Sequence, residues 1–192
     1  LSIVIFALSL FHFLTVNNSS LLNSFRAISF QVVSIITTTG YATADYTLWG
    51  SFLSFVFFLL LFSGASAGST SGGIKIVRIV LLIKNSLLEF KRRLHPKAII
   101  PLMLNGNTVS GQITYNLLAF IFLYLFIFTL GSLILTVIGV DFLTSISAAA
   151  TAIGNVGPGI GSVGPSASFS HLPDLAKWVL SLLMLMGRLE LF

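Results

Sequence analysis

Long apolar stretches alternate with short polar breaks along the first part of the chain. Residues 1–16 are almost wholly apolar and are followed by a polar turn at 17–20. Residues 23–37 form a shorter, weakly amphipathic segment that carries Arg26 near its start. A helix of about 14 residues is only about 21 Å long, whereas a membrane crossing needs about 20 residues. The pattern therefore predicts one outgoing helix and then a re-entrant helix.

Residues 48–83 are apolar at both ends, but a run of small residues at 64–73 interrupts them. An unbroken helix of this length, at about 1.5 Å per residue, would extend well beyond a bilayer. We therefore predict two half-helices joined by a loop at membrane depth.

The second part of the chain repeats this order. Residues 98–109 alternate around Asn105-Gly106, which indicates a small hairpin. Residues 113–138 are the clearest transmembrane helix, 141–153 are again a short segment, and a final helix is expected from about Pro173. Placing Gly157 on Gly40 also pairs residues of the two short segments: Phe142 with Phe25, Thr151 with Ser34, and Ile153 with Ile36.

The predicted fold class is an all-α membrane protein of two tandem helix–pore loop–helix repeats, with a broken second helix in the first repeat. The expected units are 1–83 and 111–192, joined by a cytoplasmic linker at 84–110. Because apolar sequence stands at both ends, we expect the chain to be a fragment of a larger protein. Parallel repeats of this kind are common among transporters.

Composition and charge support a membrane location. Hydrophobic residues make up 56% of the chain and charged residues 8%, whereas a soluble domain carries about 25% charged residues. Seven of the ten Lys and Arg residues lie between two apolar spans: Lys75, Arg78, Lys84, Lys91, Arg92, Arg93 and Lys97. This clustering is typical of a cytoplasmic connection, and it argues against nucleic acid as the partner. The cluster is also compatible with anionic lipid head groups or a cytoplasmic protein.

Two loops with glycine follow the two short segments. Their residues are Thr37, Thr38, Thr39, Gly40 and Tyr41 in the first, and Gly154, Asn155, Val156, Gly157 and Pro158 in the second. Backbone carbonyls can replace the hydration shell of a cation, and glycine tolerates the backbone angles that this requires. The C-terminus of a short helix also directs partial negative charge toward the ion. One such loop alone would more readily be an ordinary interhelical turn. Two of them, each after a short apolar helix and flanked by spans, favour a pore.

Four motifs resemble those of the Trk/Ktr/HKT superfamily of potassium transporters, and the Trk branch most closely. They are Thr-Thr-Thr-Gly-Tyr, Ser-Gly-Gly-Ile-Lys, Gly-Asn-Val-Gly-Pro-Gly-Ile-Gly and Gly-Arg-Leu-Glu-Leu-Phe. The resemblance covers nearly the whole chain and implies the third and fourth repeats of a four-repeat pore. It implies that potassium is bound by the carbonyls of Thr38, Thr39, Gly40, Asn155, Val156 and Gly157. Each predicted filter strand carries one glycine, whereas Thr-Val-Gly-Tyr-Gly of potassium channels carries two. This difference suggests that some sodium also passes.

The resemblance also implies a location, partners and a gate. The location is the bacterial inner membrane, crossed several times, and the partners are membrane lipid, a second copy of the protein and a cytoplasmic nucleotide-binding regulatory subunit. The gate would comprise Gly64, Gly68, Ser69, Thr70, Ser71, Gly72 and Gly73, with Arg188. Close helix packing is an alternative role for the small residues. The alternatives for Arg188 are pairing with Glu190 and extension toward the cytoplasmic surface.

Other classes of protein are less consistent with the sequence. A phosphate-binding loop is not matched by the small-residue run. His12, His95 and His171 lie far apart and are expected to be interfacial polar residues. We expect no enzyme activity and no cofactor, with potassium as the transported ion. The rival hypotheses are a two-pore-domain potassium channel subunit, which predicts Thr-Val-Gly-Tyr-Gly filters, and a polytopic membrane enzyme or scaffold.

Overall fold

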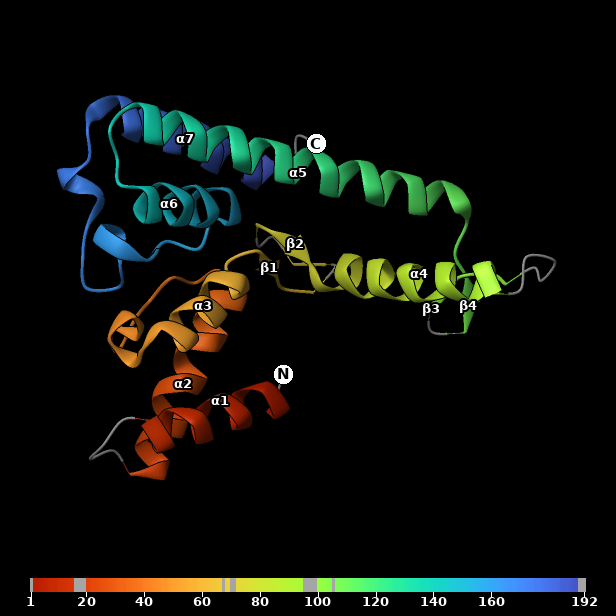
Figure 1. Cartoon of the computed structure of the whole chain (residues 1–192), viewed down its shortest axis with the longest axis horizontal. Helices are drawn as coiled ribbons and strands as arrows, with labels where there is room; N and C mark the ends of the chain where they lie inside the picture. Colours follow the sequence, from red (N-terminus) through yellow and green to blue (C-terminus); the bar gives the residue numbers. More distant parts are fainter. Residues whose placement is uncertain are drawn as a thin grey trace.

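The computed structural model describes residues 2–15, 20–66, 68–69, 72–94, 100–104 and 106–189. Its helices form two groups, one above the other, with a strand-containing connection between them (Figure 1). The first group contains α1 (Ser2–Thr15), α2 (Leu21–Ile36) and α3 (Ser51–Leu60). The second contains α5 (Gly111–Val137), α6 (Phe142–Gly154) and α7 (Asp174–Leu189). These helices confirm the predicted all-α fold class.

Hydroxyl and carboxyl side chains fix where the two short helices begin. The side chain of Ser20 accepts a hydrogen bond from the Asn23 amide at 3.3 Å at the start of α2. The carboxyl of Asp141 accepts one from the Thr144 amide at 3.4 Å at the start of α6. Each cap satisfies an amide that has no partner within its own helix. Helix α2 consequently begins at Leu21, two residues earlier than the sequence pattern predicted.

The first group packs around buried aromatic and branched side chains. Tyr46, Leu53 and Phe57 are fully buried, and they face Ile28 and Val32 of α2 within one apolar cluster. Tyr46 belongs to the short helix η1 (Tyr46–Trp49), which precedes α3. The core thus anchors the segment that leaves the first loop.

His12 differs from the prediction of an interfacial position. Its side chain is only 5% exposed, and its Nδ1 lies 3.0 Å from Ser24 Oγ on the facing helix. The ring also packs edge-on against Trp49, with 4.7 Å between the centroids. His12 is therefore a core residue that joins α1 to α2, because a hydroxyl partner offsets part of the cost of burying its polar ring. His171, in contrast, is exposed and lies 3.0 Å from Ser162 Oγ, whereas His95 falls outside the described residues.

The second group owes its close packing to small residues. Thr144 and Ser145 and every residue from Ser147 to Gly154 are buried, and most of them are alanine, serine or threonine. A methyl group at Gly131 of α5 would lie 2.7 Å from Leu183 Cδ1 of α7. Small residues at helix contacts allow the close approach that is typical of membrane proteins. The short helix α6 is thus enclosed by α5 and α7.

The predicted break between two half-helices is confirmed. Helix α3 ends at Leu60, and α4 (Ile76–Leu94) begins after the small-residue run. A parallel strand pair, β1 (Ser63–Gly64) with β2 (Ile74–Lys75), closes the connection. The sequence did not predict this pair, since two residues per strand leave no periodic pattern. Helix α4 also continues through residues 84–94, which had been expected to belong to the linker.

The remaining elements follow the predicted order. Strands β3 (Met103–Leu104) and β4 (Asn107–Thr108) form the expected antiparallel hairpin, although Asn105 lies outside the described residues. The 3-10 helices η2 (Gly161–Val163) and η3 (Phe169–His171) lie between α6 and α7. By length and composition, α5 is the one described helix that could cross a membrane, and α1, α2, α3 and α6 are shorter apolar helices.

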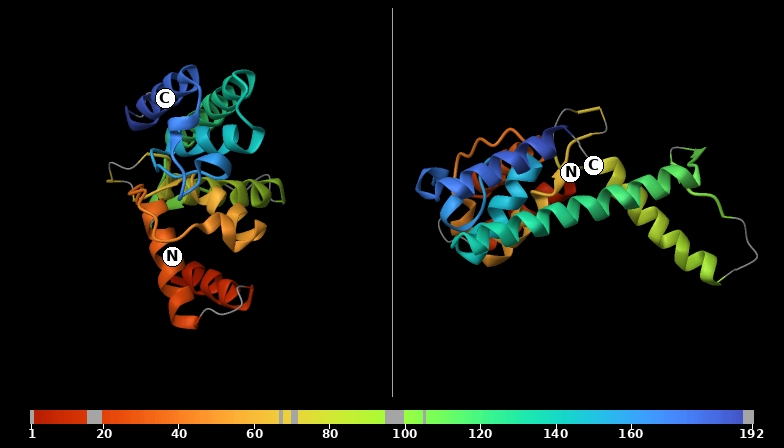
Figure 2. Two further views of the ribbon diagram at one scale, coloured as in Figure 1. Left: turned by 90° about the vertical axis from the view of Figure 1, so that its left-hand side faces the viewer. Right: turned by 90° about the horizontal axis from the view of Figure 1, so that it is seen from above.

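The two ends of the molecule differ in charge. Helices α6 and α7 begin at the left end in Figure 1, where Asp141 is the N-cap of α6 and Asp174 lies in the first turn of α7. Helix α4 ends at the right, where its last turn carries Lys91, Arg92 and Arg93. Figure 2 shows α4 and α5 diverging toward this basic end. The basic end is the one that the charge pattern predicts to lie on the cytoplasmic side.

Candidate functional site

The two predicted filter loops share one backbone conformation. Thr38, which follows the C-cap Thr37 of α2, and Asn155, the C-cap of α6, both have φ of +54°. Two residues further on, Gly40 has φ of +78° and Gly157 has φ of +121°. Threonine rarely adopts a positive φ, so its presence in the left-handed region at Thr38 indicates a loop held by its surroundings.

Hydrogen bonds repeat in the same way. The Thr39 amide donates to Ser34 O at 2.9 Å, and the Val156 amide donates to Thr151 O at 3.0 Å. Each bond runs from a loop residue back to the last turns of its short helix. Both pairs match the residues that superpose when Gly157 is placed on Gly40. Two distant segments of dissimilar sequence therefore end their helices in the same way.

The loops lie backbone against backbone. A methyl group at Gly40 would overlap the carbonyl oxygen of Val156 and would lie 3.5 Å from Pro158 Cδ. One at Gly157 would lie 3.6 Å from the Gly40 Cα. The structure thus brings Gly40, Val156, Gly157 and Pro158 together, while Thr37, Thr39 and Tyr41 are exposed. Carbonyl oxygens are the polar groups that this arrangement concentrates.

Side chains that the sequence pattern did not identify hold the ends of both loops. Ser34 Oγ donates to Tyr41 O at 2.7 Å, and Gln31 Nε2 donates to Ala44 O at 2.8 Å. In the second loop, Thr151 Oγ1 accepts from the Gly157 amide at 2.9 Å. Polar residues facing inward from a short apolar helix are a signal that could have identified them, because buried hydroxyl and amide groups need partners.

Beyond the second loop, two further side chains bind the backbone. Ser147 Oγ donates to Ile160 O at 2.6 Å, and the hydroxyl of Tyr46 donates to Gly159 O at 2.8 Å. Tyr46 comes from the first group of helices, so this bond connects the two groups.

The small-residue run lies against the end of α6. A methyl group at Gly72 would lie 2.5 Å from the carbonyl oxygen of Gly154, and one at Gly154 would lie 2.7 Å from Leu61 O. Gly64 and Gly72 are equally close, since a methyl group at the first would lie 2.5 Å from the carbonyl oxygen of the second. The run therefore meets the base of the second loop.

The other predicted gate residues are placed differently. Gly73 has φ of +77°, which glycine adopts without strain. Gly68 is exposed, with no heavy atom within 4 Å of where a methyl group would stand, and Ser69 is half-buried. Thr70 and Ser71 lie outside the described residues.

Helix α7 closes the other side of the second loop. Asn155 Nδ2 donates to Met184 O at 3.0 Å. A methyl group at Gly187 would overlap the carbonyl oxygen of Ile153, so α7 touches the last turn of α6 directly. Arg188 follows Gly187 and is exposed in the last turn of α7. Its expected contact with the small-residue run stays a prediction.

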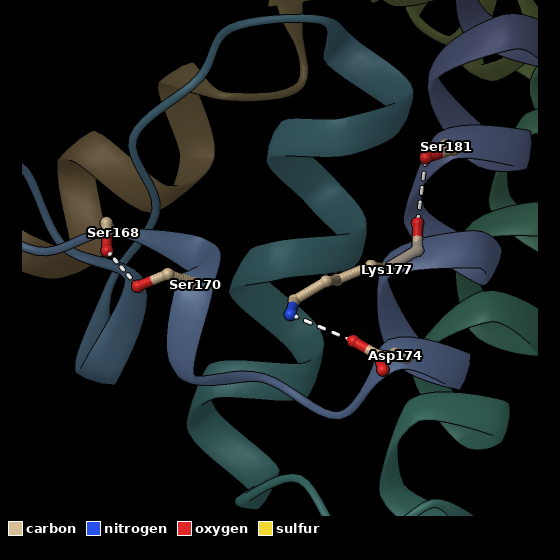
Figure 3. Close-up of polar contacts among 5 residues, drawn as sticks. All are labelled: Ser168, Ser170, Asp174, Lys177 and Ser181. Carbon is tan, nitrogen blue, oxygen red and sulfur yellow. Dashed lines mark hydrogen bonds and ion pairs between the residues drawn. The ribbon is translucent and has the colours of Figure 1, made fainter.

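A cavity of about 510 Å³ opens beside the paired loops. Gly40, Gly157 and Pro158 line one side, and Lys177 and Ser181 of α7 line the other. Figure 3 shows Lys177 turned toward Asp174, with Nζ and Oδ1 3.1 Å apart, while Ser181 Oγ donates to Lys177 O at 2.8 Å. The carboxylate partly offsets the lysine charge beside this cavity.

Asp45 connects the two loop regions near the acidic end. Its carboxylate accepts hydrogen bonds from Ser166 Oγ at 2.5 Å and from the Thr47 amide at 3.0 Å. Burial alone would raise the pKa of Asp45, but the hydrogen bonds from Ser166 and Thr47 outweigh it and lower the pKa below its usual range. Asp45 is therefore a fixed negative charge across the neutral pH range.

Side-chain metal ligands are not grouped within the ranges that the structure describes. No set of three or more His, Cys, Asp or Glu residues there could hold a metal ion. The ligands that the paired loops offer are backbone oxygens, which suit hard monovalent cations.

Comparison with known proteins identifies the family of the chain. The family model described as TrkH, cation transport protein, matches residues 1–192. The chain belongs to this family of membrane proteins that transport cations.

Particular relatives are potassium uptake proteins. The chain is 42% identical over 172 residues to the Trk system potassium uptake protein TrkI of Halomonas elongata, covering 88% of this chain and 34% of that protein. It is 36% identical over 174 residues to the Trk system potassium uptake protein TrkH of Escherichia coli K12, covering 91% and 36%. The chain therefore spans about a third of the length of these relatives.

A solved structure supports the fold. The crystal structure of the potassium transporter TrkH from Vibrio parahaemolyticus superposes with a TM-score of 0.88 at 37% sequence identity. The superposition covers 99% of this chain and 40% of that protein.

Proposed function

We propose that this chain forms half of a four-stranded potassium pathway through the bacterial inner membrane, with potassium taken up down its electrochemical gradient. The single observation that carries the proposal is the pairing of two loops with the same left-handed backbone pattern, glycine against carbonyl. The named relatives, which are potassium uptake proteins, support potassium as the ion.

In this proposal, residues 1–83 and 111–192 are two helix–pore loop–helix units joined by 84–110. Carbonyls of Thr38, Thr39 and Gly40 in the first unit, and of Asn155, Val156 and Gly157 in the second, bind potassium. Thr37, Tyr41, Gly154 and Pro158 complete the two filter segments, and some sodium passes because each strand has one glycine. Helices α2 and α6 support the ion by directing their C-termini at these loops.

The small-residue run acts as the gate below the filter. Gly64, Gly68, Ser69, Thr70, Ser71, Gly72 and Gly73 form its moving part, and Arg188 stabilises the closed position. The support for this role is the contact of Gly72 with the base of the second loop. A charged side chain in an apolar helix also needs a polar partner or water.

The complete protein acts as a homodimer with a cytoplasmic nucleotide-binding subunit. The basic last turn of α4, with Lys91, Arg92 and Arg93, lies at the end opposite the acidic loops. Positive charge at this position favours an acidic protein surface or anionic lipid. Both partners are part of the proposal.

Growth of a potassium-uptake-deficient bacterium tests the function. The full-length protein that contains this chain should restore growth at low potassium, and its Gly157→Ser variant, at matched membrane expression, should need more potassium or admit more sodium. No rescue by the inserted parent, supplied with its regulatory subunit, would refute potassium uptake. Equal rescue by both would keep the transport function and refute the filter role of Gly157.

A further inference from the structure

Tyr46 connects the first unit to the second filter segment. Its side chain is 0% exposed, and its hydroxyl donates a 2.8 Å hydrogen bond to Gly159 O, 113 residues away. Gly159 stands two positions beyond Gly157, at the outer end of the segment. A buried phenol of this kind needs a partner for its hydroxyl. Here the partner is the Gly159 carbonyl, which lies next to the predicted filter segment.

The ring of Tyr46 is itself held firmly. It stacks on Phe57 with 4.8 Å between centroids and 22° between planes. Phe57 is 0% exposed and also packs against Trp49 at 5.9 Å. Because these rings fill the core of the first group, the hydroxyl can shift little without disturbing that core.

The carbonyl that Tyr46 holds is equally constrained from its own side. The Gly159 amide donates to Val163 O at 2.8 Å. A methyl group at Gly159 would lie 2.9 Å from Val163 Cγ2 and 3.2 Å from Ser147 Oγ. Gly159 is therefore a fixed point, and the tyrosine determines where that point stands relative to the first unit.

The other bonds at the loop ends lie within one unit. Ser34 and Gln31 bind the backbone of their own loop, and Ser147 binds Ile160 of its own loop. Such bonds shape each loop but do not set the distance between the two. The Tyr46 bond joins the units close to the filter, and the bond from Ser166 to Asp45, the residue before Tyr46, supports the same junction.

We propose that Tyr46 is a positioning residue for selectivity: its hydroxyl fixes the outer end of the second filter segment against the first. The inference rests on the proposed potassium pathway. A set of carbonyls favours potassium over the smaller sodium ion only while the oxygens keep their number and spacing. Without the bond, the 157–160 segment can relax, and the oxygens can close around sodium.

The test is the ratio of potassium to sodium permeability of the full-length protein in liposomes, measured from reversal potentials. Tyr46→Phe keeps the ring and removes the hydroxyl. The ratio should fall by about two- to tenfold, which is the effect that one hydrogen bond has on an equilibrium. The matched control is Tyr124→Phe, which alters a tyrosine of α5 that is 1% exposed and lies in the other core cluster; its ratio should equal the parent's.

Three outcomes would overturn the inference. An unchanged ratio in Tyr46→Phe, with parental potassium flux, would refute Tyr46 and leave the proposed function standing. An equal fall in Tyr124→Phe would assign the effect to general loosening of the helices. A parent without potassium flux would refute the proposed function itself.

If purified Tyr46→Phe does not fold, Phe57→Leu provides the second variant. It keeps the hydroxyl but removes the ring on which Tyr46 stacks, and the proposal predicts a lower ratio here too. A parental ratio in Phe57→Leu would then contradict the proposal.

Discussion

Gly40 and Val156 meet so closely that a methyl group on the first would overlap the carbonyl oxygen of the second. Each residue comes from a different loop, and the loops are more than 100 positions apart in the chain. Glycine is required at this contact for two reasons, the close approach and the φ of +78°. The two predicted filter segments therefore depend on each other.

Alanine at Gly40 is expected to be more damaging than alanine at Gly157. Alanine at either position would have to keep a positive φ, +78° at Gly40 and +121° at Gly157, which is unfavourable for an L-residue. Only Gly40→Ala also displaces the Val156 carbonyl, whereas at Gly157 the nearest atom would be 3.6 Å away. In rubidium uptake by cells with matched membrane expression, Gly40→Ala should lose at least about tenfold, equivalent to about 1.4 kcal/mol. A larger loss for Gly157→Ala would contradict the observed packing.

The small-residue run offers a matched pair of glycines. At Gly72 a methyl group would lie 2.5 Å from Gly154 O, whereas at Gly68 it would meet nothing within 4 Å. We expect Gly72→Ala to alter uptake strongly, because the run must move away from the base of the second loop. Gly68→Ala should transport potassium as the parent does. Single-channel recording in bilayers would measure the ion current through both variants. Similar behaviour of the two variants would argue against a gate at this contact.

Asn155 combines two effects that a pair of variants can separate. Its φ of +54° is unfavourable for most side chains, and its amide donates to Met184 O. Asn155→Gly removes the bond, at about 0.5–1.5 kcal/mol, but it tolerates the backbone angle. Asn155→Ala should unfold at a lower temperature than Asn155→Gly in detergent, because it adds about 1–2 kcal/mol of backbone strain. Equal melting temperatures would show that the loop relaxes around alanine.

Asp45 should contribute stability that depends on pH. Although burial opposes the change, hydrogen bonds from Ser166 and Thr47 lower the folded-state pKa of Asp45 below the ordinary value of 3.8. The contribution is then fully present above about pH 4–5 and is lost as pH falls through the lowered pKa. The difference in melting temperature between parent and Asp45→Asn should therefore shrink on acidification.

Ser166→Ala gives the complementary measurement. Removing one donor raises the folded-state pKa of Asp45 toward its ordinary value, while the unfolded-state pKa is unchanged. The acid loss of stability should therefore be smaller than in the parent and should be complete at a higher pH. A difference between parent and Asp45→Asn that stays constant from neutral to strongly acidic pH would contradict the role of these hydrogen bonds.

Much of the fold could be predicted from the pattern of apolar and polar positions along the sequence. The break between α3 and α4, the long α5 and the short α2 and α6 all follow from segment length and small-residue content. Composition could not predict that His12 is buried, because its partner Ser24 is contributed by another helix. Nor could periodicity reveal the extension of α4 through Leu94, where helix propensity continues past the apolar stretch.

The candidate site was predicted only in part. Glycine content and position identified Gly40 and Gly157, whose residue type directly reflects the backbone angle. Tyr46 left no such signal, since a buried tyrosine is common and its partner is set by the tertiary fold. The positive φ of Thr38 was also unexpected, because threonine has no intrinsic preference for it.

The central claim is that carbonyls of the two paired loops bind the transported ion. Crystals of the full-length protein soaked in rubidium or thallium, measured by anomalous diffraction, test it most directly. We expect ion density between the loops, bounded by carbonyl oxygens of residues 38–40 and 155–157. Density that lies elsewhere in a conducting protein, with none between these loops, would contradict it.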